Sequence, residues 1–113
     1  MSNRNLPHEA TLCKAVNDKC TVQLKYKDEI MHRVFCPHAV FESSTGRFLV
    51  AGTQIEKDGV RTHPGEWQMF QIDRISNIDV ITDLVFKPDP AFNSFDRGFY
   101  GDNVICAVDR PSL

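Results

Sequence analysis

From Cys20 onward, apolar side chains recur at every second position, and this alternation restricts the possible folds more than any other feature of the chain. Cys20, Val22, Leu24 and Tyr26 alternate with polar residues, which is typical of a strand with one face on a hydrophobic core. Shorter runs of the same kind follow, separated by small, polar or glycine-containing segments. They predict strands over residues 31–42, 47–55, 67–72 and 78–86, turns at 27–29, 43–46 and 56–59, a loop at 60–66 and a connection at 73–77.

The residues before this β region follow a helical period instead. Pro7 stands where a first helical turn tolerates proline, and Leu12, Ala15 and Val16 are spaced i, i+3, i+4. A short helix over residues 7–16 is therefore expected. In the second strand, Pro37 implies an edge position, a bulge or a bend.

One short helix followed by short strands defines the expected fold class, which is mainly β. We expect a small, five-stranded antiparallel barrel of the Sm or SH3 kind, preceded by the helix. The last of these strands should place Ile78, Val80, Leu84 and Phe86 on one face. The 113 residues fit a single barrel domain over 1–88 with a C-terminal extension over 89–113.

The extension differs in composition from the strands that precede it. Phe92, Phe95, Phe99 and Tyr100 stand among glycine, asparagine and aspartate. Such rings either cover an open end of the barrel, which we expect, or form an exposed patch that binds a partner. Residues 104–108 are expected to add a sixth strand.

Charge and hydropathy limit the functional class. Thirteen basic and fifteen acidic residues give a formal net charge of -2, which argues against a broad surface for duplex nucleic acid but allows a local basic groove. The longest apolar stretch, residues 48–52, is too short to span a bilayer, and the polar start lacks a signal-peptide core. We therefore expect a cytoplasmic protein without a membrane partner.

The four cysteines, at positions 13, 20, 36 and 106, include no C-x-x-C pair. Irregular spacing suggests neither a zinc ribbon nor a disulfide framework, so reduced thiols are expected. His32, Cys36 and His38 share one face of a regular strand and could be read as metal ligands. They fit a half-buried strand face better, and neither a metal nor another cofactor is predicted.

Three local patterns are more specific than these periodicities. An apolar-x-apolar-x-Tyr run ends at Tyr26, after a helix that contains Ala15. Residues 33–37 form an Arg-x-apolar-x-Pro-like element that is followed by Val40 and Phe41. Residues 70–75 read Phe-Gln-Ile-Asp-Arg-Ile, which is similar to a Phe-Arg-Leu-Asp-Arg-Ile signature.

Together these patterns resemble the WYL domain of bacterial transcriptional regulators over residues 12–88. The Trp-Tyr-Leu tripeptide of that family aligns with Phe48, Leu49 and Val50 and is not kept. The resemblance implies an Sm-like barrel that senses a ligand, including nucleic-acid fragments and other anionic signals, and that usually follows a DNA-binding helix-turn-helix domain. Here it would be a stand-alone module.

The matched positions supply the candidate ligand-binding residues. Arg33 and Arg74 are the matched arginines, and a guanidinium pairs bidentately with phosphate or carboxylate. Tyr26 could stack on a base or donate a hydrogen bond, whereas Gln68 and Gln71 stand where the family usually has basic residues. Alternatively, Arg74 pairs with neighbouring Asp73 and Tyr26 fills the core.

The predicted function is a regulatory module that binds a small anionic ligand or a short single-stranded nucleic acid. The alternative is a protein-interaction or assembly module that uses the barrel edge or the aromatic tail, and a homodimer is plausible. The sequence contains no H-E-x-x-H, G-x-S-x-G or phosphate-binding glycine motif, so we expect no enzymatic activity.

Overall fold

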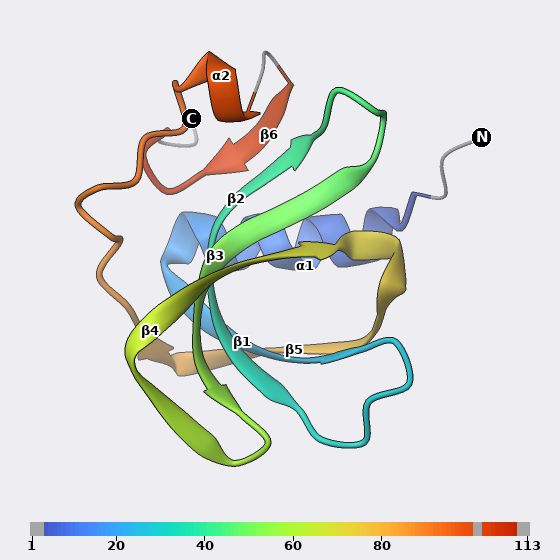
Figure 1. Ribbon diagram of the computed structural model, residues 1–113, viewed down its shortest axis with the longest axis vertical. Helices are drawn as coiled ribbons and strands as arrows, with labels where there is room; N and C mark the ends of the chain where they lie inside the picture. Colours follow the sequence, from blue (N-terminus) through green and yellow to red (C-terminus); the bar gives the residue numbers. More distant parts are fainter. Residues whose placement is uncertain (1–3, 101–102, 111–113) are drawn as a thin grey trace.

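The computed structural model describes residues 4–100 and 103–110 and consists of a helix followed by a curled antiparallel sheet (Figure 1). This architecture confirms the predicted mainly β fold class. The elements run in the order α1 (Leu6–Asp18), β1 (Cys20–Tyr26), β2 (Arg33–Glu42), β3 (Phe48–Lys57), β4 (Val60–Gln71), the 3-10 turn η1 (Ile72–Arg74), β5 (Ile75–Val85), α2 (Arg97–Tyr100) and β6 (Val104–Ala107).

Helix α1 has well-defined ends. The side chain of Asn5 accepts a hydrogen bond from the backbone N–H of His8, and proline occupies the first turn. Lys19 caps the C-terminus of the helix and adopts a positive φ of 55°. Leu12, Ala15 and Val16 are fully buried, as their spacing predicts. No helix among the described residues is long and apolar enough to cross a membrane.

The strands are ordered β4-β3-β2-β1-β5, and β6 pairs with β2. Figure 1 shows this sheet curled into a half-barrel, and α1 lies against β1, β2, β5 and β6. β4 and β5 form the two ends of the main path and do not pair with each other. The barrel is therefore open between them, with η1 as the covalent link.

Strand β2 changes its neighbour halfway along its length. Its first part pairs with β1 through Phe35 and Val22, and its second part pairs with β6 through Val40 and Cys106. The change follows Pro37, where the β2–β3 register also shifts. Because proline lacks an N–H, the ladder is interrupted there and the strand can bend. The bend or bulge predicted at this position is present.

A glycine allows the two bent strands to approach each other. A Cβ on Gly52 of β3 would lie 2.1 Å from the Cys36 carbonyl oxygen and 2.8 Å from the Phe35 ring. Only glycine fits such a close backbone contact. The main core forms on the inner face of the curl and contains Leu12, Ala15, Cys20, Val22, Leu24, Phe35, Val40, Phe48, Val50, Phe70, Ile72 and Ile75.

Most predicted strands are present, and β1 has the predicted bounds. The predicted loop at residues 60–66 is wrong, because β4 continues from Val60 to Gln71. The Pro64-Gly65 pair is accommodated at a register shift on this edge strand, where a missing N–H does not interrupt a central ladder. Strand β5 also begins at Ile75, within the predicted connection.

The predicted single apolar face of the fifth strand is only partly correct. Ile78 and Val80 pack against the core, but Leu84 is exposed. The register between β1 and β5 shifts between Cys20 and Thr21. This irregularity breaks the alternation, so a face defined at the start of β5 does not continue to its end.

The expectation of reduced thiols is wrong for two of the four cysteines. Cys13 of α1 and Cys106 of β6 form a disulfide, with 5.8 Å between their Cα atoms. They are 93 residues apart in sequence, so no short spacing motif could reveal the pair. Cys20 and Cys36 are free and buried.

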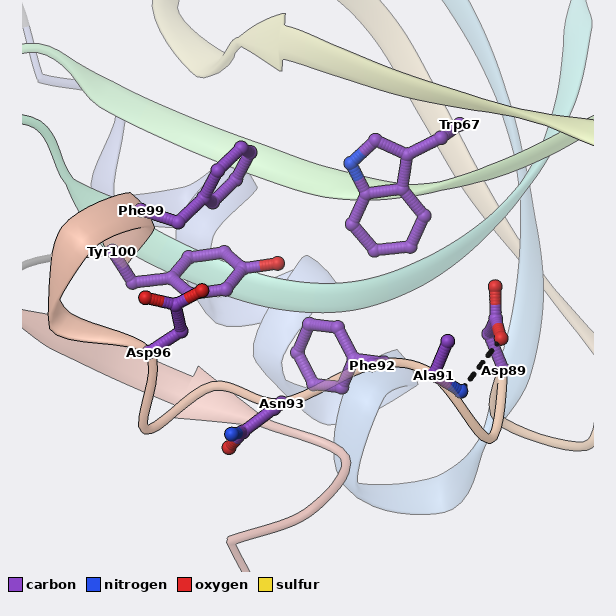
Figure 2. A pocket seen from close by; sticks show the side chains of 8 residues that line it. All are labelled: Trp67, Asp89, Ala91, Phe92, Asn93, Asp96, Phe99 and Tyr100. Atoms are coloured by element: carbon purple, nitrogen blue, oxygen red, sulfur yellow. Dashed lines mark hydrogen bonds between the residues drawn. The ribbon is translucent and has the colours of Figure 1, made fainter.

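The aromatic residues of the C-terminal extension differ in burial. β6 adds the predicted sixth strand, and Tyr100 is buried in a second cluster with Ala39, Phe41, Ala51 and Ala107. Figure 2 shows that Phe92 and Tyr100 line the same pocket as Trp67 of β4. Phe95 and Phe99 remain exposed. Residues 101–102 and 111–113 of the predicted extension lie outside the described part of the chain.

Candidate functional site

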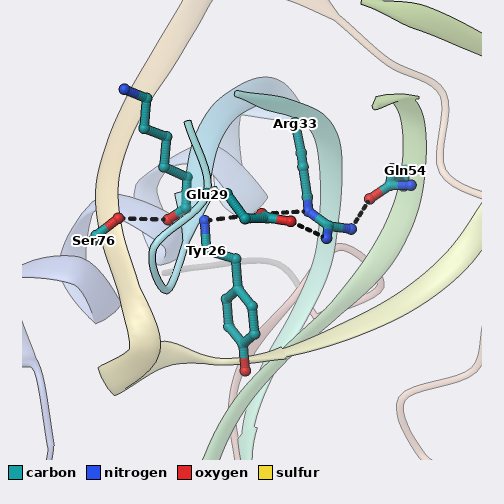
Figure 3. Close-up of polar contacts among 6 residues, drawn as sticks. Tyr26, Glu29, Arg33, Gln54 and Ser76 are labelled. Carbon is teal, nitrogen blue, oxygen red and sulfur yellow. Dashed lines mark hydrogen bonds and ion pairs between the residues drawn. The ribbon is translucent and has the colours of Figure 1, made fainter. Parts of the chain in front are cut away.

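Arg33, the first residue of β2, is the centre of a polar cluster on the inner face of the curl. Its Nε donates to Oε1 of Glu29 at 2.8 Å, and its Nη2 pairs with the other carboxylate oxygen. Its Nη1 donates to Oε1 of Gln54 at 2.8 Å (Figure 3). The guanidinium also lies over the Phe70 ring, 5.4 Å from the centroid. The side chain of Arg33 is 13% exposed, so this fork is largely shielded from water.

The ion pair stabilises the charged forms of both side chains. The hydrogen bond from Arg33 is the main cause that lowers the pKa of Glu29, and the same hydrogen bond raises the pKa of Arg33. The turn that carries Glu29 is closed by two contacts with Tyr26: the Tyr26 N–H donates to the Glu29 carboxylate, and the Glu29 N–H donates to the Tyr26 carbonyl. The carboxylate is therefore held in place before any ligand binds.

Tyr26 lies beside the same aromatic ring as Arg33. Its ring centroid is 5.1 Å from that of Phe70, and its hydroxyl oxygen accepts a hydrogen bond from the Gln71 N–H at 3.3 Å. The core-filling alternative for Tyr26 is thus correct in part, because the ring packs while remaining half-buried. The side chain of Gln71 accepts from Arg47 at 3.3 Å.

The side chains of the other two candidates take no part in the hydrogen bonds of this cluster. Gln68 of β4 is paired with Gly52 of β3, on the side of the sheet that also carries Phe70. Arg74 is exposed at the end of η1, and its backbone carbonyl accepts from the Lys27 N–H at 2.8 Å. Its guanidinium forms no ion pair with the described residues, so the alternative pairing with Asp73 is absent. The structure therefore connects Tyr26 and Arg33 through their shared partners Glu29 and Phe70 and leaves the exposed Arg74 outside this cluster.

Two residues of the cluster were missed by the sequence analysis. Glu29 was assigned only to a turn, and its spacing of four residues from Arg33 is a charge-pairing signal only on a helix, which this segment does not form. Gln54 occupies a strand position whose neighbours alternate regularly, and it is fully buried, which single-sequence reasoning does not expect of glutamine.

Two of the three side chains considered as metal ligands, His38 and Cys36, have other partners, and His32 lies just before β2. His38 is buried, its Nδ1 lies 2.8 Å from the Cys36 carbonyl oxygen, and its Nε2 accepts from the Asp89 N–H at 3.0 Å. Both ring nitrogens are thus used by backbone groups. The Cys36 thiol, whose pKa is raised by burial, lies 3.9 Å from the Thr21 hydroxyl. The described residues contain no group of three potential metal ligands.

The arrangement is a guanidinium fork that is already filled by a carboxylate of its own chain. A bidentate carboxylate has the same geometry that a phosphate or an external carboxylate would use. An anion could bind Arg33 here only in exchange for Glu29. After such an exchange Arg33 still has an anionic partner, because one anionic group replaces another.

Comparisons with known proteins provide a structural likeness only. No protein family profile matches the sequence, and no curated protein has a similar sequence. A solved structure of proteasome accessory factor B/C (PafBC) of Arthrobacter aurescens is similar, with a TM-score of 0.62 and 18% sequence identity. The match covers 77% of this chain and 13% of PafBC. Because PafBC contains a WYL domain, the likeness supports the predicted resemblance at the level of the fold, and the half-barrel of this chain is WYL-like.

Proposed function

We propose that this chain is a regulatory module that senses an anionic ligand by binding rather than by catalysis. The ligand is a small anionic molecule or a short single-stranded nucleic acid, and it binds Arg33 in place of Glu29. The observation that carries the proposal is the shielded ion pair between these residues beside Phe70. The WYL-like fold supports a regulatory role but does not identify the ligand.

The aromatic surroundings suit such a ligand. The guanidinium lies over the Phe70 ring, which packs against Tyr26, and aromatic rings next to arginine favour bases that carry phosphate groups. Gln54 keeps one Nη of Arg33 in position through its own hydrogen bond. The remaining fork of Arg33, which now binds Glu29, is then available for the anion.

Exchange at Arg33 would also transmit a signal. Glu29 belongs to the turn between β1 and β2, and this turn contacts η1 through the Lys27 N–H and the Arg74 carbonyl. Release of the Glu29 carboxylate removes two hydrogen bonds that hold the turn to Arg33. A bound anion would therefore change the mobility of the turn and of the adjoining part of η1.

Titration at low salt with adenosine monophosphate and a short oligothymidylate tests the proposal. Glu29→Gln removes the competing charge and should strengthen binding about three- to tenfold, the range expected for a partly exposed ion pair. Arg33→Gln should abolish binding. Arg33→Lys keeps the charge without the fork and should bind weakly, which separates loss of the fork from loss of folding.

Arg74→Gln is the control variant, because it leaves the Glu29–Arg33 pair intact. Its affinity should stay within about twofold of the original chain. Unchanged binding after Arg33→Gln, in protein with a normal melting curve, would contradict the proposed site. If Arg74→Gln weakens anion binding and Glu29→Gln does not strengthen it, the anion binds at η1 instead.

A second candidate function is assembly through an open sheet edge. Strand β4 ends the main path of the sheet and exposes Val60, Trp67 and Met69. Unpaired strand edges can accept a strand from another chain. The oligomeric state in solution tests this alternative. Truncation of the extension is unsuitable, because it would remove β6, the buried Tyr100 ring and Cys106.

A further inference from the structure

A pocket of about 300 Å³ lies between β4 and the C-terminal extension, and it contains none of the residues of the Arg33 cluster. Its volume is at the lower end of the range for small-molecule sites. The pocket is lined mainly by aromatic rings and also carries carboxylates. The lining that matters here consists of Trp67, Phe92, Phe99, Tyr100, Asp89 and Asp96 (Figure 2).

The rings support one another and do not depend on a ligand for their positions. The Phe92 centroid lies 5.8 Å from that of Trp67 and 5.7 Å from that of Tyr100. Phe99 contacts Tyr100 at 4.6 Å, and Tyr100 rests on Phe41 of β2 at 5.0 Å. The buried Tyr100 thus anchors the group to the sheet.

Two of the rings nevertheless keep large surfaces in water. Trp67 is 39% exposed and Phe99 is 49% exposed. Figure 2 shows the Tyr100 hydroxyl pointing into the space between Trp67 and Phe92. A pre-arranged group of rings with exposed surface therefore borders the pocket, and ring faces carry partial negative charge.

The charged residues of the pocket are acidic. Asp89 and Asp96 lie at opposite ends in Figure 2, and no lysine or arginine is among the described residues that line it. One oxygen of each carboxylate accepts a backbone N–H, from Ala91 at 2.9 Å and from Gly98 at 3.0 Å. These bonds fix the carboxylates, and an ionised carboxylate can accept further hydrogen bonds.

The Tyr100 hydroxyl lies close enough to these charges to be affected by them. Its pKa is raised to about 12, first by burial and then by the charges of Asp109 and Asp96. Burial opposes a charge of either sign, whereas the two nearby carboxylates oppose a negative charge specifically. An anion would be repelled from the same position, whereas a cation would be attracted.

We propose that this pocket binds a small organic cation with a methylated ammonium group, such as a quaternary ammonium compound. Rings attract such cations through their negative faces, and the methyl groups fill an apolar pocket with little loss of hydration. The carboxylates of Asp89 and Asp96 supply the opposite charge. This inference is independent of the proposed anion site, since the two sites share no residue.

The chain contains its own reporter, because Trp67 is the only tryptophan in the sequence and lines the pocket. Choline is added to the full-length chain while its fluorescence is followed, with sodium chloride at equal ionic strength as the reference. A saturable change in Trp67 fluorescence is expected. The methyl protons of choline should also shift upfield, because they lie over aromatic rings.

The neutral compound 3,3-dimethylbutan-1-ol is the matched control ligand, because it has the shape of choline without the charge. It should bind at least about tenfold more weakly, as expected if charge contributes most of the attraction. Equal responses to both compounds would overturn the proposal in favour of a merely apolar pocket. No saturable response to choline would overturn it as well.

Two variants connect the response to the pocket. Phe99→Ala removes an exposed ring and Asp96→Asn removes a charge, and each should weaken choline binding about three- to tenfold. Phe95→Ala removes a ring of the same segment that lies outside the pocket beside Arg110, and it should leave binding unchanged. If Phe99→Ala and Asp96→Asn fold normally and bind choline like the original chain, the site is wrong.

Discussion

At the scale of single residues, His38 shows how one side chain connects the sheet to the extension. Its Nδ1 donates to the Cys36 carbonyl, because its Nε2 must accept the Asp89 N–H. This fixes the neutral imidazole as the state that satisfies both backbone groups. Burial is the main cause that lowers the pKa of His38, while Cys36 and Asp89 partly oppose the shift.

The lowered pKa predicts that acid weakens the fold. The unfolded chain has an ordinary histidine pKa near 6.5, so below that pH it binds more protons at this residue than the folded chain does. The free energy of unfolding should therefore fall as the pH decreases below about 6.5, by at most about 1.4 kcal/mol per pH unit from this residue. Urea unfolding between pH 7.5 and 5.5 measures the slope.

The control for this pH effect is His38→Asn, whose side-chain amide can still donate to the Cys36 carbonyl. The variant is expected to be less stable at neutral pH, because the Asp89 N–H loses its acceptor. Its stability should nevertheless depend less on pH over this interval. Equal slopes for the two proteins would show that His38 is not the group responsible.

The site residues also show what single-sequence reasoning can identify. Tyr26 and Arg33 could be selected because each stands at a matched position of a recognisable pattern, the apolar-x-apolar-x-Tyr run and the element over residues 33–37. Glu29 could not be ranked above the neighbouring acidic residue Asp28, since only the folded turn decides which carboxylate faces Arg33. Gln54 could not be identified because its buried side chain accepts a hydrogen bond from Arg33, which lies 21 positions away in the sequence.

At the scale of elements, the strands were predictable wherever alternation is regular. β1 has the expected bounds because its register with β2 is regular over residues 22–24. The errors occur at register shifts, as at residues 60–66 of β4 and at Leu84 of β5. A bulge depends on the partner strand, so local sequence shows the proline or glycine but not how the ladder accommodates it.

The link between α1 and β6 leads to a prediction at the same scale. The Cys13–Cys106 disulfide closes a long loop, and such a link stabilises mainly by restricting the unfolded chain. Cys106→Ser should lower the free energy of unfolding by about 2–4 kcal/mol. Denaturant unfolding without reductant measures this loss.

A reducing agent separates the covalent link from the packing of the side chain. Dithiothreitol should lower the melting temperature of the original chain and should not affect Cys106→Ser. Thiol titration of the unfolded chain should give two more reactive thiols after reduction. If dithiothreitol leaves the original melting temperature unchanged, the link contributes nothing to stability.

At the scale of the whole molecule, the arrangement of β6 lay beyond what the sequence could predict. A sixth strand was expected, but its position beside the second half of β2 depends on the bend after Pro37. That bend releases one edge of β2 from β1 and leaves it free for a strand from the far end of the chain. Such pairing is a property of the folded sheet rather than of either segment.

The two end strands of the main path, β4 and β5, differ in character, and this difference underlies the last prediction. β4 exposes Trp67 and Met69, whereas β5 places the exposed acidic residues Asp79 and Asp83 on its strand. Acidic side chains on both copies repel each other, so β5 is the less favourable edge for self-association. If the chain assembles, a second copy should pair along β4.

Light scattering after size-exclusion chromatography measures this assembly. The original chain should show the mass of a dimer, and Met69→Lys should shift it to the monomer because lysine opposes edge-to-edge pairing. Leu84→Lys is the matched control, since Leu84 is 41% exposed on β5 and Met69 is 45% exposed on β4. Leu84→Lys should leave the dimer intact. A monomeric original chain would exclude assembly through β4, and a monomer produced only by Leu84→Lys would assign it to β5.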